Sequence, residues 1–184
     1  FSDECYEQLT YDKTYVSTAC LGENTEKVLT FQSCSKTYAM TGWRIGYTAG
    51  NKQIIKAMAK LQGQSTSCPN SIAQAAAIEA LTGDQSEVSH MRNVFKNRRD
   101  YIVDRLNNMS GVNCDTPGGA FYVFPDFSSY MGDDSKIKSS DDLSLYLLEQ
   151  KAVVSVAGKA FGSDSNVRFS YAASKDDLKR AMDL

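Results

Sequence analysis

Two serines, a lysine and an arginine share one short segment of this 184-residue chain: Ser33, Ser35, Lys36 and Arg44. The segment directly follows an apolar run, residues 27–31, whose composition predicts a buried strand. A lysine beside the end of a buried strand is unusual, because burying an ammonium group is costly unless it is paired or deprotonated. Chemistry at the Lys36 amine is one interpretation, and a lysine in a surface turn is the commoner alternative.

Other residues of the chain have side chains that could take part in chemistry. Arg168 lies within an apolar run, residues 167–169, where an unpaired guanidinium would be expensive, so a structural ion pair is one explanation. Asp3 and Tyr6 lie near the chain start, and their simplest interpretations are a solvated acid and a core or sheet-edge aromatic. The single histidine, His90, cannot by itself build a catalytic triad.

Composition excludes several classes of protein. The chain is 42% hydrophobic and 23% charged, with a formal net charge of −2, which is typical of globular domains. It has no basic run suited to nucleic acid and no apolar stretch of the roughly 18 residues that span a bilayer. The five cysteines are scattered, which predicts no metal site and favours a reducing, cytoplasmic location.

Strand and helix patterns alternate along the chain. Short strands are expected at residues 27–31, 44–48, 120–124, 153–156 and 166–170, and helices at 52–61, about 70–82, 84–109, 141–151 and after Ser174. Trp43 and Tyr47 are expected in the core. The long helix at about 84–109 is expected to bridge an α/β domain, residues 1–91, and an α+β domain, residues 92–184.

Four separated motifs carry a family resemblance. Residues 33–47 read SCSKTYAMTGWRIGY, residues 3–6 read DECY, residues 116–122 read TPGGAFY, and residues 167–170 read VRFS. The chain resembles the fold type I, pyridoxal-phosphate (PLP) dependent class I/II aminotransferases, and is most similar to the aspartate aminotransferase branch. The resemblance implies the C-terminal part of the PLP-binding large domain, with a mainly parallel sheet and helices, followed by the small domain.

The resemblance also implies roles for the polar residues of the first two motifs. Lys36 would form the Schiff base with PLP and act as the base that moves a proton, and Asp3 would face the pyridine nitrogen of the cofactor. Tyr6 would donate to the phenolic oxygen of PLP. The cofactor phosphate would be held by three residues: Ser33, Ser35 and Arg44.

The implied reaction is amino transfer from an amino acid, such as aspartate, to a 2-oxo acid such as 2-oxoglutarate. Arg168 would bind the substrate α-carboxylate. The resemblance further implies a homodimer, and a start at Phe1 leads us to expect a chain that begins within a longer protein and binds PLP weakly alone. Two alternatives are the PLP-binding sensor domain of a transcription regulator and another fold type I PLP enzyme.

Overall fold

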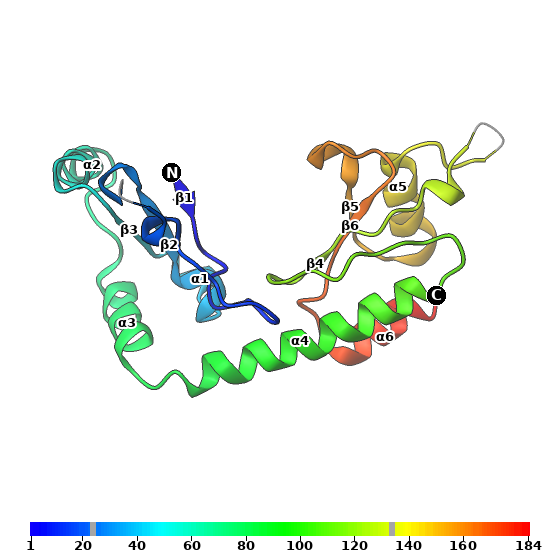
Figure 1. The fold of residues 1–184 in the computed structure, drawn as a ribbon, viewed down its shortest axis with the longest axis horizontal. Coiled ribbons are helices and arrows are strands. Elements are labelled where there is room, and N and C mark those ends of the chain that lie inside the picture. The colour runs from blue at the N-terminus through cyan, green and yellow to red at the C-terminus, as the bar shows by residue number, and fades with distance from the viewer. Residues whose placement is uncertain (23–24, 133–134) are drawn as a thin grey trace. The chain divides into compact units, whose positions relative to one another are not determined.

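The computed structural model describes residues 1–22, 25–132 and 135–184. The chain divides into two compact units, Phe1–Arg92 and Asn93–Leu184, and each has its own sheet and its own core (Figure 1). Within the described ranges, no helix is long and apolar enough to cross a membrane.

The sheet of the first unit has three strands in the order β1-β2-β3: β1 (Ser2–Asp3), β2 (Thr30–Ser33) and β3 (Gly46–Ala49). β1 pairs with β2 in parallel, with Ser2 opposite Thr30. β2 and β3 are antiparallel, with Thr30 opposite Ala49. The expectation of a mainly parallel sheet is therefore wrong for the strands that the structure describes.

The antiparallel pairing agrees with the kind of connection between β2 and β3. A parallel crossover usually contains a full helix that packs on the sheet. Residues 34–45 hold only the one-turn helix α1 (Cys34–Thr37) and the 3-10 turn η3 (Thr41–Trp43), so the chain returns beside β2 in the opposite direction.

Two longer helices follow in the first unit. α2 (Lys52–Ser65) and α3 (Ser71–Thr82) each begin after an asparagine, Asn51 or Asn70, whose side-chain oxygen accepts two backbone N–H groups of the first turn. The small residues of α3 allow a close contact, and Ala77 joins Cys34 and Met40 in a buried cluster. The predicted end of α3 at Gly83 is confirmed.

The long helix α4 (Ser86–Asn107) begins in the first unit and continues into the second. Its predicted range was two residues too long at each end. Three of its apolar residues, Ile102, Val103 and Leu106, are buried in the core of the second unit. His90 on this helix is exposed.

The second unit contains an antiparallel sheet in the order β4-β6-β5: β4 (Tyr122–Val123), β5 (Val156–Ala157) and β6 (Val167–Ser170). Helices α5 (Ser140–Lys151) and α6 (Lys175–Met182) complete it. The expected cap of α6 is confirmed, since the Asp177 backbone N–H donates to the Ser174 hydroxyl at 3.0 Å.

The shorter 3-10 turns of the chain are η1 (Thr18–Cys20), η2 (Thr25–Lys27), η4 (Ser128–Tyr130) and η5 (Gly158–Phe161).

Candidate active site

A cleft of about 420 Å³ in the first unit brings five of the predicted site residues together. Its lining comes from the end of β1, from β2 and from the connection between β2 and β3: Asp3, Cys5, Phe31, Gln32, Ser33, Ser35, Lys36, Thr41 and Arg44. Segments some 30 residues apart in sequence thus meet at one place, because β1 pairs in parallel with β2 and both strands end on the same side.

Lys36 is placed by the transition from β2 to α1. Ser33 is the last residue of β2, and its hydroxyl accepts the Ser35 N–H at 3.1 Å, which caps α1. The Cys34 N–H donates to the Ile45 carbonyl oxygen at 3.2 Å, and the Cys34 side chain is buried. Lys36 therefore lies on a short helix that is fixed at its start, and its side chain is half-buried.

Two residues with left-handed backbone flank η3. Ala39 and Arg44 both have φ of 53°, a region that residues with a β-carbon rarely occupy. The Arg44 Nη1 donates to the Thr41 carbonyl oxygen at 3.0 Å, and the guanidinium is exposed to solvent at the cleft. This bend turns the chain from α1 toward β3 and sets Arg44 beside Ser33 and Ser35 in the cleft lining.

Asp3 reaches the cleft from the end of β1. Its Oδ1 accepts the Cys5 N–H at 3.2 Å. Burial raises the pKa of the Cys5 thiol, the hydrogen bond and charge of Asp3 raise it further, and the positive charge of Lys36 acts against them. Asp3 and Lys36 are thus both close enough to Cys5 to act on it electrostatically.

Sequence reasoning missed some residues of this cleft and placed others differently. Cys5 lies in the turn that follows β1, so strand alternation could not place it in the cleft. Neither Gln32 nor Thr41 belongs to a sequence pattern that would predict its place in the cleft. Tyr6 is half-buried and stands outside the cleft lining.

The aromatic residues beside the cleft differ from expectation. Trp43 and Tyr47 were expected in the core, yet their exposed fractions are 47% and 44%. The prediction was wrong: Trp43 ends the exposed turn η3, and Tyr47 lies on β3, an edge strand of the three-stranded sheet.

Arg168 lies on β6 in the second unit and contacts two aromatic rings. Its guanidinium carbon is 4.6 Å from the ring centroid of Tyr122 and 4.7 Å from that of Phe161. Tyr122 pairs with Ser170, so it lies diagonally across from Arg168 on the same face of the sheet. In the part of the chain that the structure describes, Arg168 forms no ion pair, and this cation–π arrangement leaves the guanidinium able to bind an anion.

The turn before Tyr122 is held at two points. The buried Arg99 of α4 donates from Nη1 to the Pro117 carbonyl oxygen at 3.0 Å and pairs with Asp100 at 2.7 Å. The hydroxyl of the fully buried Tyr171 donates to the carbonyl oxygen of Ala120 at 3.0 Å. The position of Tyr122 under Arg168 is thereby fixed by the core of the second unit.

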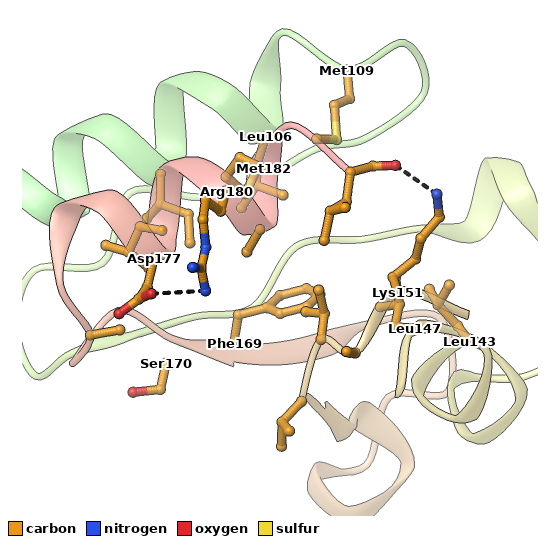
Figure 2. A pocket seen from close by; sticks show the side chains of 18 of the residues that line it. Leu106, Met109, Leu143, Leu147, Lys151, Phe169, Ser170, Asp177, Arg180 and Met182 are labelled. Carbon is orange, nitrogen blue, oxygen red and sulfur yellow. Dashed lines mark hydrogen bonds and ion pairs between the residues drawn. The ribbon is translucent and has the colours of Figure 1, made fainter. Parts of the chain in front are cut away.

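A larger cavity in the second unit, about 680 Å³, has a mainly apolar lining from α4, α5, α6 and β6 (Figure 2). Its charged residues are already engaged: Lys151 donates to the carbonyl oxygen of Leu184 at 2.8 Å, and Arg180 pairs with Asp177 at 3.1 Å. The cavity therefore gathers no set of free catalytic groups. Among the described residues, no group of three or more His, Cys, Asp or Glu side chains could hold a metal ion.

The family model for aminotransferase class I and II matches residues 1–183 of the 184. The chain belongs to the class I and II aminotransferases. This family uses PLP.

Aminotransferases of known sequence match the chain over nearly its whole length. The aspartate aminotransferase of Rhizobium meliloti is 43% identical over 98% of this chain and 46% of its own length. The aspartate/prephenate aminotransferase of Cereibacter sphaeroides is 45% identical over the same shares. The chain thus spans about half the length of the curated relatives it matches.

Solved aminotransferase structures share the fold. The aspartate aminotransferase of Rhizobium meliloti matches with a TM-score of 0.92 at 43% identity, covering 98% of this chain and 46% of that one. The aromatic aminotransferase of Pyrococcus horikoshii matches with a TM-score of 0.91 at 37% identity, covering 99% and 48%. The described residues form an α/β part of the aminotransferase fold.

Proposed function

We propose that this chain carries the cofactor-holding residues of a PLP-dependent aminotransferase that transfers an amino group from an amino acid to a 2-oxo acid. The observation that carries the proposal is the cleft of the first unit, where Lys36, Asp3, Arg44 and two serine hydroxyls meet. In this reading the first unit is the C-terminal part of the large domain, and the second unit is the small domain.

The groups in the cleft fit the chemistry of PLP. An amine can attach to its aldehyde carbon, a guanidinium and hydroxyls suit its phosphate dianion, and a carboxylate suits its protonated ring nitrogen. Lys36, Arg44 with Ser33 and Ser35, and Asp3 supply these three kinds of group within one cleft. When bound, PLP supplies an electron sink for charge developing on the substrate α-carbon.

Each residue then has a defined task. Lys36 attaches the cofactor and, once released, its amine takes and returns the proton of the substrate α-carbon. Asp3 keeps a proton on the ring nitrogen, and Arg44 with the two serines fixes the phosphate end. Tyr6 is proposed as a donor to the phenolic oxygen, and Arg168 as the bidentate partner of the substrate α-carboxylate.

The substrates proposed are aspartate as amino donor and 2-oxoglutarate as acceptor. This proposal is supported by the names of the relatives, which are aspartate and aspartate/prephenate aminotransferases. We also propose a homodimer as the active assembly, on the family resemblance.

Borohydride trapping tests the cofactor site directly. The chain is titrated with PLP, followed by its absorbance, reduced with borohydride, digested and mapped by mass spectrometry. We expect a pyridoxyl adduct on Lys36, and the variant Lys36→Ala should lose both the adduct and the absorbance band while keeping its helical content.

The matched control is Lys56→Ala, which removes an exposed lysine of α2. It should retain the Lys36 adduct at the wild-type level. An adduct that persists on other lysines in Lys36→Ala, with the absorbance band unchanged, would contradict the assignment.

A further inference from the structure

β1 is only weakly held by its backbone. It has two residues, lies at the edge of the three-stranded sheet, and is bracketed by two hydrogen bonds of 2.9 Å: the Ser2 N–H to the Leu29 oxygen and the Glu4 N–H to the Phe31 oxygen. A strand of two residues offers few backbone hydrogen bonds to its neighbour. Asp3 lies between these two hydrogen bonds, so something else must fix its carboxylate at the cleft.

Glu4 provides a second attachment on the other face of the strand. Asp3 and Cys5 line the cleft, and alternation directs Glu4 away from it, where the side chain is buried with 2% exposed. One carboxylate oxygen, Oε1, accepts hydrogen bonds from the Ser2 hydroxyl at 2.9 Å, the Ser17 hydroxyl at 3.0 Å and the Thr18 N–H at 3.1 Å.

These contacts join β1 to the start of η1. Ser17 is the N-cap of η1, since its hydroxyl also accepts the Ala19 N–H at 3.3 Å. Burial raises the pKa of Glu4, but the hydrogen bonds from Ser17, Ser2 and Thr18 outweigh it and lower the pKa below its ordinary value of 4.5. Glu4 is therefore ionised at neutral pH, and charge-assisted hydrogen bonds are about twice as strong as neutral ones.

We propose that Glu4 is a positioning residue of the candidate active site: its buried carboxylate ties the end of β1 to residues 17–18 and thereby holds the Asp3 carboxylate at the cleft. The use of Asp3 in catalysis rests on the function proposed above. The attachment of β1 to residues 17–18 through Glu4 rests only on contacts within this chain.

The test compares Glu4→Gln with the wild-type chain in the absence of cofactor. Glutamine has nearly the same size but is neutral, so its oxygen accepts the three hydrogen bonds more weakly. Amide hydrogen exchange measured by NMR should become about tenfold faster at Thr18, which donates to Glu4, and at Cys5, which donates to Asp3. The control Glu79→Gln, an exposed glutamate of α3, should leave both rates unchanged.

The result that overturns the proposal is an unchanged exchange rate at Cys5, whether or not the rate at Thr18 rises. If Glu4→Gln does not fold, as judged by circular dichroism, Ser17→Ala replaces it. That variant removes one of the donors to the Glu4 carboxylate and keeps the carboxylate, and a smaller increase is expected at Cys5. No increase there overturns the proposal equally.

A spectroscopic measurement separates positioning from general destabilisation. With PLP bound, the pH at which the cofactor absorbance changes should differ between Glu4→Gln and wild type. That pH depends on the position of the Asp3 carboxylate relative to the cofactor. An unchanged pH together with faster exchange at Cys5 would reject the positioning role. A wild-type chain that gives no Lys36 adduct would reject the proposed function alone, since the exchange measurement still decides whether Glu4 holds Asp3.

Discussion

At the scale of single residues, Arg168 is held by aromatic faces. The rings of Tyr122 and Phe161 lie 4.6 and 4.7 Å from its guanidinium carbon, and ring faces attract a cation without consuming its hydrogen-bond donors. The sequence identified Arg168 as an unusual charge in an apolar strand. It could not identify the rings, because their contact depends on the register of β4 against β6 and on the position of η5.

Replacing this guanidinium tests its proposed role. In a preparation with transaminase activity, Arg168→Lys should raise KM about 10- to 100-fold for dicarboxylic and monocarboxylic amino acids alike, because lysine cannot bind the shared α-carboxylate bidentately. Steady-state kinetics with one substrate of each kind measures this. Arg180→Lys, on the exposed face of α6, is the control. A loss restricted to dicarboxylic substrates would argue that Arg168 reads the side chain of the substrate instead.

At the scale of elements, the close pairing of β2 and β3 shapes the cleft. The two strands approach so closely at Gly46 that a β-carbon there would lie 2.5 Å from the Gln32 carbonyl oxygen, and Gln32 itself lines the cleft. Gly42, only four residues earlier, has no atom within 4 Å of the corresponding position. The two glycines of one motif thus have different physical requirements.

This difference gives a paired prediction on stability. Gly46→Ala should lower the free energy of unfolding by about 2 kcal/mol, because the added methyl group collides with backbone that cannot move without separating the strands. Gly42→Ala should change it by less than about 0.5 kcal/mol. Urea denaturation followed by circular dichroism measures both. Equal effects of the two substitutions would mean that the strands do not pair as described.

The starts of the helices were predicted more accurately than those of the strands, for a physical reason, although the predicted end of α2 at residue 61 is four residues short of Ser65. Caps such as Asn70, Ser139 and Ser174 mark helix starts in the sequence, and 3.6-residue periodicity continues over several turns. The strands have two to four residues each, too few for a period to define their ends. The predicted strand starts were one to three residues too early, and the direction of β3 depended on whether the connection from β2 holds a full helix, which the pattern left unspecified.

The site was predicted chiefly through motifs. Lys36, Ser33, Ser35 and Arg44 are neighbours in sequence, and the structure places them in one cleft with Asp3. Tyr6 belongs to the same motif as Asp3 but stands outside the cleft lining. The contacts of Glu4 with Ser17 and Thr18 were not predictable, because they join segments that have no common pattern.

At the scale of the whole molecule, α3 carries exposed apolar side chains. Ala73 and Ala77 are buried, whereas Ile72, Ile78 and Leu81 have 68%, 64% and 43% of their surface exposed. A helix that is apolar on several sides usually packs against more than one neighbour. Exposed apolar patches of this kind promote association between protein molecules.

We therefore expect the chain to self-associate through α3. Ile78→Ser should shift the monomer–oligomer equilibrium toward monomer about fivefold or more, because a largely exposed isoleucine that becomes buried on association contributes about 1 kcal/mol or more. Sedimentation velocity over a range of concentrations measures the shift. Glu79→Gln, the next residue on the helix, is the control. An unchanged equilibrium in Ile78→Ser would place the association surface elsewhere.

The left-handed backbone at Arg44 has a consequence for how this position can change over evolutionary time. A residue with a β-carbon costs about 1–2 kcal/mol in this conformation, and glycine adopts it freely. Selection for stability alone favours glycine at both Ala39 and Arg44, and only at Arg44 would selection for a charge at the cleft oppose it. If the function of the cleft were lost in some lineage, we expect Arg44 to be replaced by glycine there. An arginine retained at this position would indicate that the cleft is still functional.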